Sequence, residues 1–80
     1  MLKFKLLLPD STLFDGPVHS VTARGDLGQF EILKNHAPFM TSIHSGEVIV
    51  KKEGGEKLTF KVNGGVFLIE DNEAVLLGSL

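Results

Sequence analysis

The stretch from Gly25 to Pro38 reads GDLGQFEILKNHAP and joins two turns to one short strand. Gly25 and Gly28 favour a tight turn, because glycine adopts positive φ at little cost. Residues 29–32 alternate polar and apolar side chains, as a half-buried strand does. Residues 34–38 then form a second turn that ends in proline. This pattern predicts an exposed ridge on a rigid sheet, a place where binding residues tend to lie.

Similar alternating segments continue on both sides of this ridge. The Gly54-Gly55 pair stands between two such segments and predicts a hairpin. Asp15-Gly16-Pro17 is expected to end a short strand, and Asn35 to Thr41 has room for one helical turn at most. The chain therefore predicts an all-β fold, a flattened β-sandwich or barrel of about 8–10 short, mostly antiparallel strands in one domain over residues 1–80. The expected strands, besides 29–32, are residues 2–8, 13–14, 18–24, 39–43, 47–52, 57–62, 66–70 and 74–77.

Composition narrows the classes of function. The 80 residues carry 8 basic and 10 acidic side chains and no cysteine. A net negative charge argues against nucleic acid as a partner, and the lack of cysteine excludes disulfides and thiolate metal sites. No apolar run is long enough to span a membrane, and the N-terminus lacks the pattern of a signal peptide. Lys3 and Lys5, like Lys51 and Lys52, are expected on solvated strand faces that protect sheet edges.

Residues for catalysis or metal binding are present without a convincing pattern. Ser20, His36 and Asp26 could supply a nucleophile, base and orienting acid, but such a triad is recognised by geometry and not by inventory. The three histidines lack the spacing of paired metal ligands, and the glycine pairs do not open helices that could hold a phosphate. We therefore predict no catalytic, cofactor-binding or metal-binding residues. His36 is expected to bond local backbone in its turn, or else to contact a partner.

Several separated motifs, in order, resemble the epsilon subunit of F-type ATP synthases. Residues 25–38 are similar to the family's G-x-x-G-x-[FLI]-x-I-L-x-x-H-x-P segment, and residues 13–16 are similar to its L-F-x-G. Further similarities run through residues 18–23, 40–46, 62–67 and 72–77, so the resemblance covers essentially the whole chain.

The resemblance implies a fold and a role. The family's N-terminal domain is a flattened ten-strand β-sandwich in the rotating central stalk. One end of it rests on the c-ring, and one side packs against the gamma subunit. This implies a non-catalytic rotor subunit without a cofactor, peripheral to the cytoplasmic face of the bacterial inner membrane. Most bacterial members continue into a two-helix C-terminal domain, to which these 80 residues have no counterpart.

Contacts are carried over from the family by position. The c-ring contact is expected at Asp26, Leu27, Gly28, Gln29, Glu31 and His36, with the turn 36–38 beside the turn 26–29. Many members carry an acidic residue at the position of Gln29, so the amide here argues against a salt bridge at this contact, although it can still donate and accept hydrogen bonds. The gamma contact is expected at Phe39, Met40, Thr41, Ile43, Val66, Phe67 and Leu68, since apolar and aromatic anchors dominate interface cores. The alternatives are a protein-binding adaptor unrelated to ATP synthase, and a small enzyme or carbohydrate-binding barrel.

Overall fold

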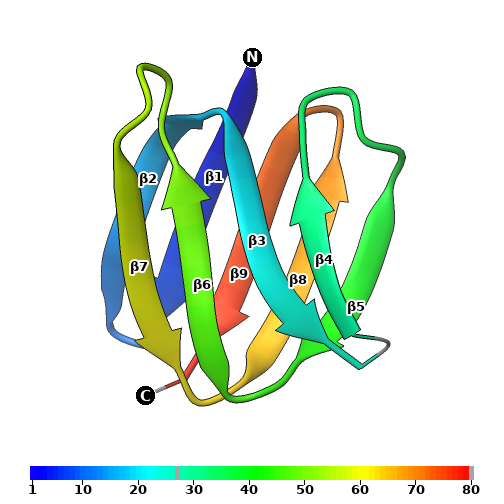
Figure 1. Ribbon diagram of the computed structural model, residues 1–80. Helices are drawn as coiled ribbons and strands as arrows, with labels where there is room; N and C mark the ends of the chain where they lie inside the picture. Colours follow the sequence, from blue (N-terminus) through cyan, green and yellow to red (C-terminus); the bar gives the residue numbers. More distant parts are fainter. Residues whose placement is uncertain (27, 80) are drawn as a thin grey trace.

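A computed structural model describes residues 1–26 and 28–79, and these residues form nine strands with no helix (Figure 1). Nine agrees with the number expected from the alternating segments, and the all-β fold is confirmed. The strands are β1 (Leu2–Leu8), β2 (Ser11–Val18), β3 (Ser20–Gly25), β4 (Gly28–Ile32), β5 (Phe39–Ile43), β6 (Gly46–Lys51), β7 (Lys57–Val62), β8 (Gly65–Glu70) and β9 (Glu73–Gly78).

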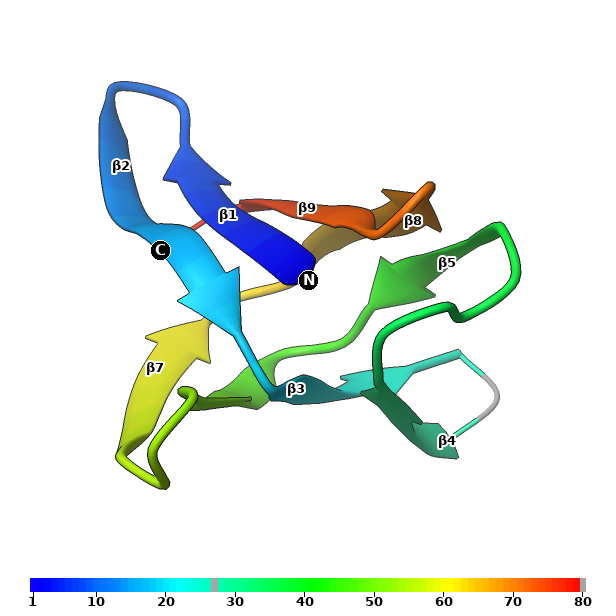
Figure 2. The same cartoon turned by 90° about the horizontal axis from the view of Figure 1, so that it is seen from above.

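One curled sheet makes both layers of the sandwich. Its strand order is β2-β1-β9-β8-β5-β3-β6-β7, with β4 paired to β3. Figure 2 shows β2, β1, β9, β8 and β5 as one layer, called here the back layer, over a front layer of β7, β6, β3 and β4. The layers join where Gly25 pairs with Ile43. All pairs are antiparallel except that of β1 with β9, so the expected arrangement is confirmed.

Alternate side chains of both layers fill the core. Phe4 and Phe67 are fully buried at its centre, with ring centroids 6.5 Å apart. Aromatic rings also close the two open sides of the sandwich. Phe14 of β2 contacts Phe60 of β7 at 6.2 Å on one side, and Phe30 of β4 contacts Phe39 of β5 at 5.3 Å on the other. Side chains thus seal the layers where the backbone does not, which supplies the packing that an 80-residue chain without disulfides needs.

Two expectations about the early strands are wrong. Asp15-Gly16-Pro17 does not end a strand, because β2 continues to Val18 and pairs Lys3 with Pro17. Proline is tolerated there since β2 is the outermost strand of its layer and has a free edge. The strand expected over 18–24 is divided at His19, where the chain passes from the back layer to the front layer. This corner explains why Ser20 and Val21 are both buried, which simple alternation does not allow.

Lys3, Lys5 and Lys51 lie on solvated strand faces, as expected, but they do not protect edges. Lys3 and Lys5 are on β1, which is paired on both sides, and Lys51 is on β6, also paired on both sides. Lys52 lies in the β6–β7 hairpin, where its Nζ is 3.7 Å from a carboxylate oxygen of Glu56. The helical turn allowed between Asn35 and Thr41 does not form, since β5 begins at Phe39.

The loops gather at two ends of the sandwich. The end with the β3–β4, β5–β6 and β7–β8 connections, at the bottom of Figure 1, is called here the lower end. The upper end carries the β4–β5 loop and the β8–β9 turn, which are bonded to each other through Asn35 and Asn72. The Asn35 backbone N–H donates to Asn72 Oδ1 at 2.5 Å, and Asn72 Nδ2 donates to Asn35 Oδ1 at 3.2 Å. Both residues have positive φ, 64° and 63°, a conformation that asparagine tolerates better than most residues.

Candidate functional site

The outer surface of the back layer carries apolar side chains over four neighbouring strands. Met40, Leu68 and Val75 form one cross-strand row of partners over β5, β8 and β9. A second row pairs Val66 with Leu77 and Leu77 with Leu7 on β1. We call the six residues the apolar outer face: Leu7, Met40, Val66, Leu68, Val75 and Leu77. Met40 is 70% exposed, Leu77 50% and Val66 39%.

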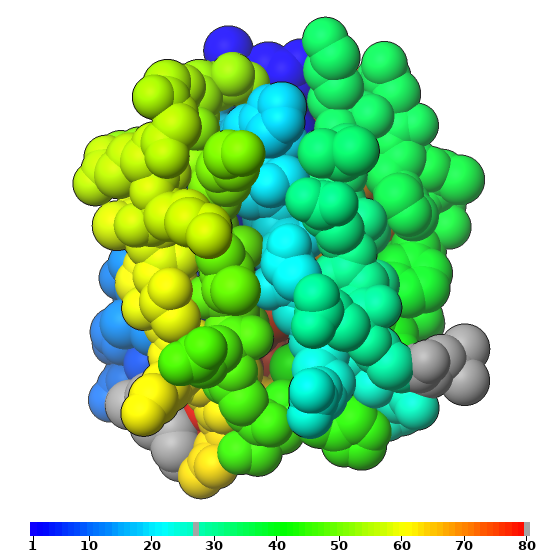
Figure 3. Space-filling model, in the orientation of Figure 1, coloured from blue at the N-terminus to red at the C-terminus, as the bar shows by residue number. Residues whose placement is uncertain are grey.

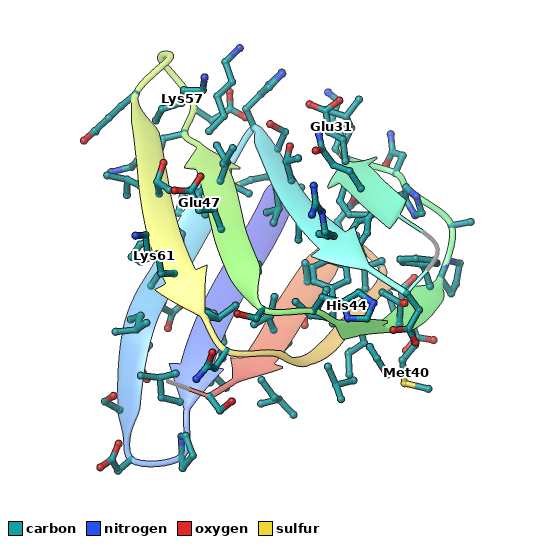
Figure 4. All side chains as sticks on the ribbon, turned by 60° about the horizontal axis from the view of Figure 1, so that its bottom comes forward. Glu31, Met40, His44, Glu47, Lys57 and Lys61 are labelled. Carbon is teal, nitrogen blue, oxygen red and sulfur yellow. The ribbon has the colours of Figure 1, made fainter. Side chains whose placement is uncertain are left out.

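The outer surface of the front layer is polar by contrast, and we call it the polar outer face. Its cross-strand partners include Glu47 with Lys61, Lys51 with Lys57, and Thr22 with Glu31. Figure 4 shows Glu47, Lys57 and Lys61 along β6 and β7. A sheet with one face on the core ordinarily presents such polar residues to water. The front layer follows this rule and the back layer breaks it, so the apolar outer face has the character of a surface that another molecule covers.

The lower end brings polar side chains together from three connections. His44 Nε2 is 3.2 Å from Asp26 Oδ1, and both side chains are more than half exposed. Ser45 Oγ donates to Asn63 Oδ1 at 3.3 Å. A hollow of about 250 Å³ opens between the lower parts of β3 and β6, lined in part by Arg24, Gln29 and Glu47, and is visible in Figure 3. This end offers hydrogen-bonding groups, not a catalytic arrangement.

The residues expected at the c-ring do not all share one end. Asp26, Gly28 and Gln29 lie at the lower end, and Leu27 lies outside the described residues. Glu31 lies further along β4, toward the upper end, where it pairs with Thr22, and Figure 4 shows it away from His44. His36 follows β4, so the expectation that turn 36–38 lies beside turn 26–29 is wrong. The five residues of β4 separate the two turns by roughly 13 Å, at about 3.3 Å of strand per residue.

His36 has a structural role in its turn. Its Nδ1 is 2.7 Å from the carbonyl oxygen of Ala37, and its ring lies 5.8 Å from that of Phe39, measured between centroids. The first contact confirms the expectation that this histidine bonds local backbone. The second places it at the rim of the aromatic cluster that closes the sandwich.

The residues expected at the gamma subunit fall into two groups, those that point outward from the sheet and those that point into the core. Met40, Val66 and Leu68 point outward and belong to the apolar outer face. Phe67 and Ile43 point into the core, with 0% and 6% exposure, so as direct contacts they are wrong. Phe39 and Thr41 share the inward parity of Ile43 and are half-buried. Successive residues of a strand face opposite sides, so a contiguous run of β5 cannot all touch one partner.

Sequence reasoning missed Leu7, Val75 and Leu77 as part of this face. A signal was present in the run Ala74 to Leu77, where all four residues are apolar. Such a strand is typical of burial on both faces, whereas a strand with one solvated face alternates.

The residues considered for chemistry are not brought together. Asp26 contacts His44, whereas His36 lies beyond the far end of β4, and Ser20 is 3% exposed. Within residues 1–26 and 28–79, no three His, Asp or Glu side chains are placed to share a metal ion. In the same residues there is no helix that could cross a membrane.

The sequence matches known proteins along nearly its whole length. The family model described as "ATP synthase, Delta/Epsilon chain, beta-sandwich domain" matches residues 1–79. The ATP synthase epsilon chain of Chlorobaculum tepidum is 36% identical over 72 residues, which are 90% of this chain and 82% of the relative. That of Geobacter metallireducens is 41% identical over 76 residues, 95% of this chain and 54% of the relative. The chain thus spans about half the length of relatives such as the Geobacter protein.

The fold is shared with a chain of a solved assembly. A chain in the mitochondrial ATP synthase of Euglena gracilis, determined with OSCP, F1 and the c-ring, superposes with a TM-score of 0.93. It is 22% identical, and the match covers 99% of this chain and 51% of that chain. Because the family model spans the described strands and the relatives match over most of the chain, this protein belongs to the ATP synthase delta/epsilon-chain family and comprises its beta-sandwich domain.

Proposed function

We propose that this chain is a non-catalytic rotor component of the central stalk of a proton- or sodium-translocating F-type ATP synthase, where it links the gamma subunit to the c-ring. The observation that carries the proposal is the apolar outer face. A monomeric domain of this size gains nothing by exposing Met40, Val66 and Leu77 on the outer side of its back layer, when the outer side of its front layer is polar. Covering these side chains with a partner would convert that exposure into binding free energy.

The gamma subunit is the partner proposed for the apolar outer face, in keeping with the family resemblance. Phe39, Ile43 and Phe67 then act indirectly, since they hold β5 and β8 in place from inside the core. The back layer is paired along the whole of β8 and β9 and sealed by aromatic side chains, so it forms a stiff platform. Stiffness is the property that a torque-transmitting element requires.

The c-ring is proposed to meet the lower end. Asp26, Gly28 and Gln29 are carried by the β3–β4 turn, at one extremity of the sandwich, where they are exposed. His44 stands beside them through its contact with Asp26. His36 is left out of this contact because it lies at the opposite end. In this arrangement the chain is peripheral to the membrane, on the cytoplasmic side in a bacterial cell, and has no active site of its own.

Co-purification with the gamma subunit tests the first contact. We expect Met40→Ala to weaken binding by about 2 kcal/mol, roughly thirtyfold in Kd, which is typical of removing one buried methionine side chain. Lys57→Ala, on the polar outer face, is the matched control and should bind as the unchanged chain does. Equal losses for the two variants, with both shown to be folded by circular dichroism, would contradict the proposal.

Site-specific cross-linking tests the second contact. A photo-reactive residue at Gln29 should cross-link to the c subunit in assembled enzyme, and the same residue at His36 should not. Cross-linking from His36 alone would place the upper end at the c-ring and reverse the proposed orientation.

A further inference from the structure

A second hollow lies where the apolar outer face meets the lower end. It has a volume of about 600 Å³ and is lined by Asp26, Met40, Thr41, Ser42 and Val66. Two of these residues, Met40 and Val66, belong to the apolar outer face, and Asp26 belongs to the lower end. The hollow is therefore continuous with the surface proposed for the gamma subunit. Figure 4 shows Met40 and His44 on the two sides of this corner.

The lining combines apolar walls with one negative charge. Met40 is 70% exposed and Val66 39%, so both side chains are available to a partner. The Thr41 hydroxyl donates to the Ser42 carbonyl oxygen at 3.2 Å. Among the described residues that line the hollow, none is basic, so the charge of Asp26 is not balanced within it.

The contact of Asp26 with His44 leaves room for another cation. His44 Nε2 lies 3.2 Å from Asp26 Oδ1, and an imidazole is a cation only when it is protonated. A carboxylate has two oxygens and about four acceptor positions. The Asp26 side chain is also 56% exposed, so a donor can approach it from outside.

We propose that this hollow receives a long basic side chain, arginine or lysine, of the subunit that covers the apolar outer face. This inference rests on the proposed function. The methylene groups of such a side chain would lie against Met40 and Val66, while its charged head would donate to the Asp26 carboxylate. An aliphatic side chain would pack against Met40 and Val66 but would offer no hydrogen-bond donor to the Asp26 carboxylate. An acidic side chain would be repelled by that carboxylate. Charge and shape together thus select one class of occupant, which sets the register of the partner at the corner nearest the lower end.

Binding of purified gamma subunit by isothermal titration calorimetry, at about 50 mM and about 500 mM salt, tests the inference. We expect Asp26→Asn to raise Kd about tenfold at the lower salt concentration, with a smaller difference at the higher one. Asp71→Asn is the matched control, because Asp71 is exposed in the β8–β9 turn at the upper end and asparagine tolerates its φ of 53°. It should bind as the unchanged chain does.

His44→Gln separates a direct role of Asp26 from a role in holding the loops together. It removes the imidazole and leaves the carboxylate, so we expect binding equal to or tighter than that of the unchanged chain. A loss for His44→Gln as large as that for Asp26→Asn would overturn the inference, and so would equal binding by Asp26→Asn and Asp71→Asn. Self-association of the chain that Asp26→Asn abolishes, without an effect on gamma binding, would assign the hollow to a second copy and also overturn it. Failure of the unchanged chain to bind gamma would instead overturn the proposed function, and the inference with it.

Discussion

Gly65 is the position where the smallest change should have the clearest effect on the sandwich. It begins β8 with a φ of 154° and pairs with Gly78 at the end of β9. A methyl group added at Gly65 would overlap the backbone carbonyl oxygen of Leu77 and would lie 2.9 Å from the Gly78 Cα. These are backbone atoms, so no side-chain rotation relieves the clash. Gly65→Ala must therefore separate β8 from β9 under the apolar outer face.

The expected cost has two parts, and Gly46 separates them. Gly46 has a φ of 155°, nearly identical to that of Gly65, but an added methyl group there meets nothing within 4 Å. Gly46→Ala thus carries only the backbone strain, about 1–2 kcal/mol. Gly65→Ala carries the same strain and adds the overlap with β9, about 2 kcal/mol for forced displacement of a packed element. We expect a total near 3–4 kcal/mol, a large part of the stability of a small domain.

Urea unfolding followed by far-UV circular dichroism measures both costs. The chain has no tryptophan or tyrosine, so intrinsic fluorescence is a poor probe of its unfolding. We expect Gly65→Ala to lose about 2 kcal/mol more free energy of unfolding than Gly46→Ala, which corresponds to roughly 8–16 °C in Tm for a domain of this size. Equal losses for the two variants would refute the reasoning, because only the Gly65 methyl group meets the β9 backbone.

Three further substitutions test the core, the upper end and the apolar outer face. Phe67→Ala removes a fully buried ring that packs on three other phenylalanines. It should lower the free energy of unfolding in urea by about 3–5 kcal/mol, and a loss below about 1 kcal/mol would contradict this packing. Asn72→Gly keeps the positive φ but removes both side-chain bonds to Asn35, so we expect a loss of about 1–2 kcal/mol by the same assay and faster amide exchange in the β4–β5 loop. Leu77→Lys should leave the free energy of unfolding within about 0.5 kcal/mol of that of the unchanged chain, yet abolish gamma binding in a pull-down. Thr59→Lys is its control on the polar outer face and should change neither the stability nor the binding.

Much of the fold could be predicted from alternation and turn residues. The hairpin at Gly54-Gly55, with φ values of 94° and 100°, lies where the glycine pair indicated it. Buried residues also alternate along β1 and β6, as the alternating segments of the sequence indicated. The errors fall where local signals compete with the sheet. Gly16 and Pro17 are turn residues by composition, but β2 accepts them because its outer edge needs no hydrogen-bond donor.

The candidate surfaces were predicted less completely. Met40, Val66 and Leu68 were found because the resemblance directed attention to β5 and β8. Phe67 and Ile43 were included wrongly, since a run of residues was assigned to a partner without regard to strand parity. His36 was grouped with Asp26 because the family resemblance put its turn beside the same end, although an intervening strand carries the two turns to opposite ends.

Short strands, and the places where most of them turn, could be inferred from the amino-acid sequence alone, because period-two alternation and glycine turns are local properties. The family was indicated separately, by the resemblance of several motifs in order. The three-dimensional fold was needed to show which side of the apolar run 74–77 in β9 faces outward. It also decided which loops share an end, and that Asp26, Met40 and Val66 line one hollow. These relations depend on the pairing of strands distant in the chain, and the order in which strands pair is set by the packing of the whole sheet and not by any one segment.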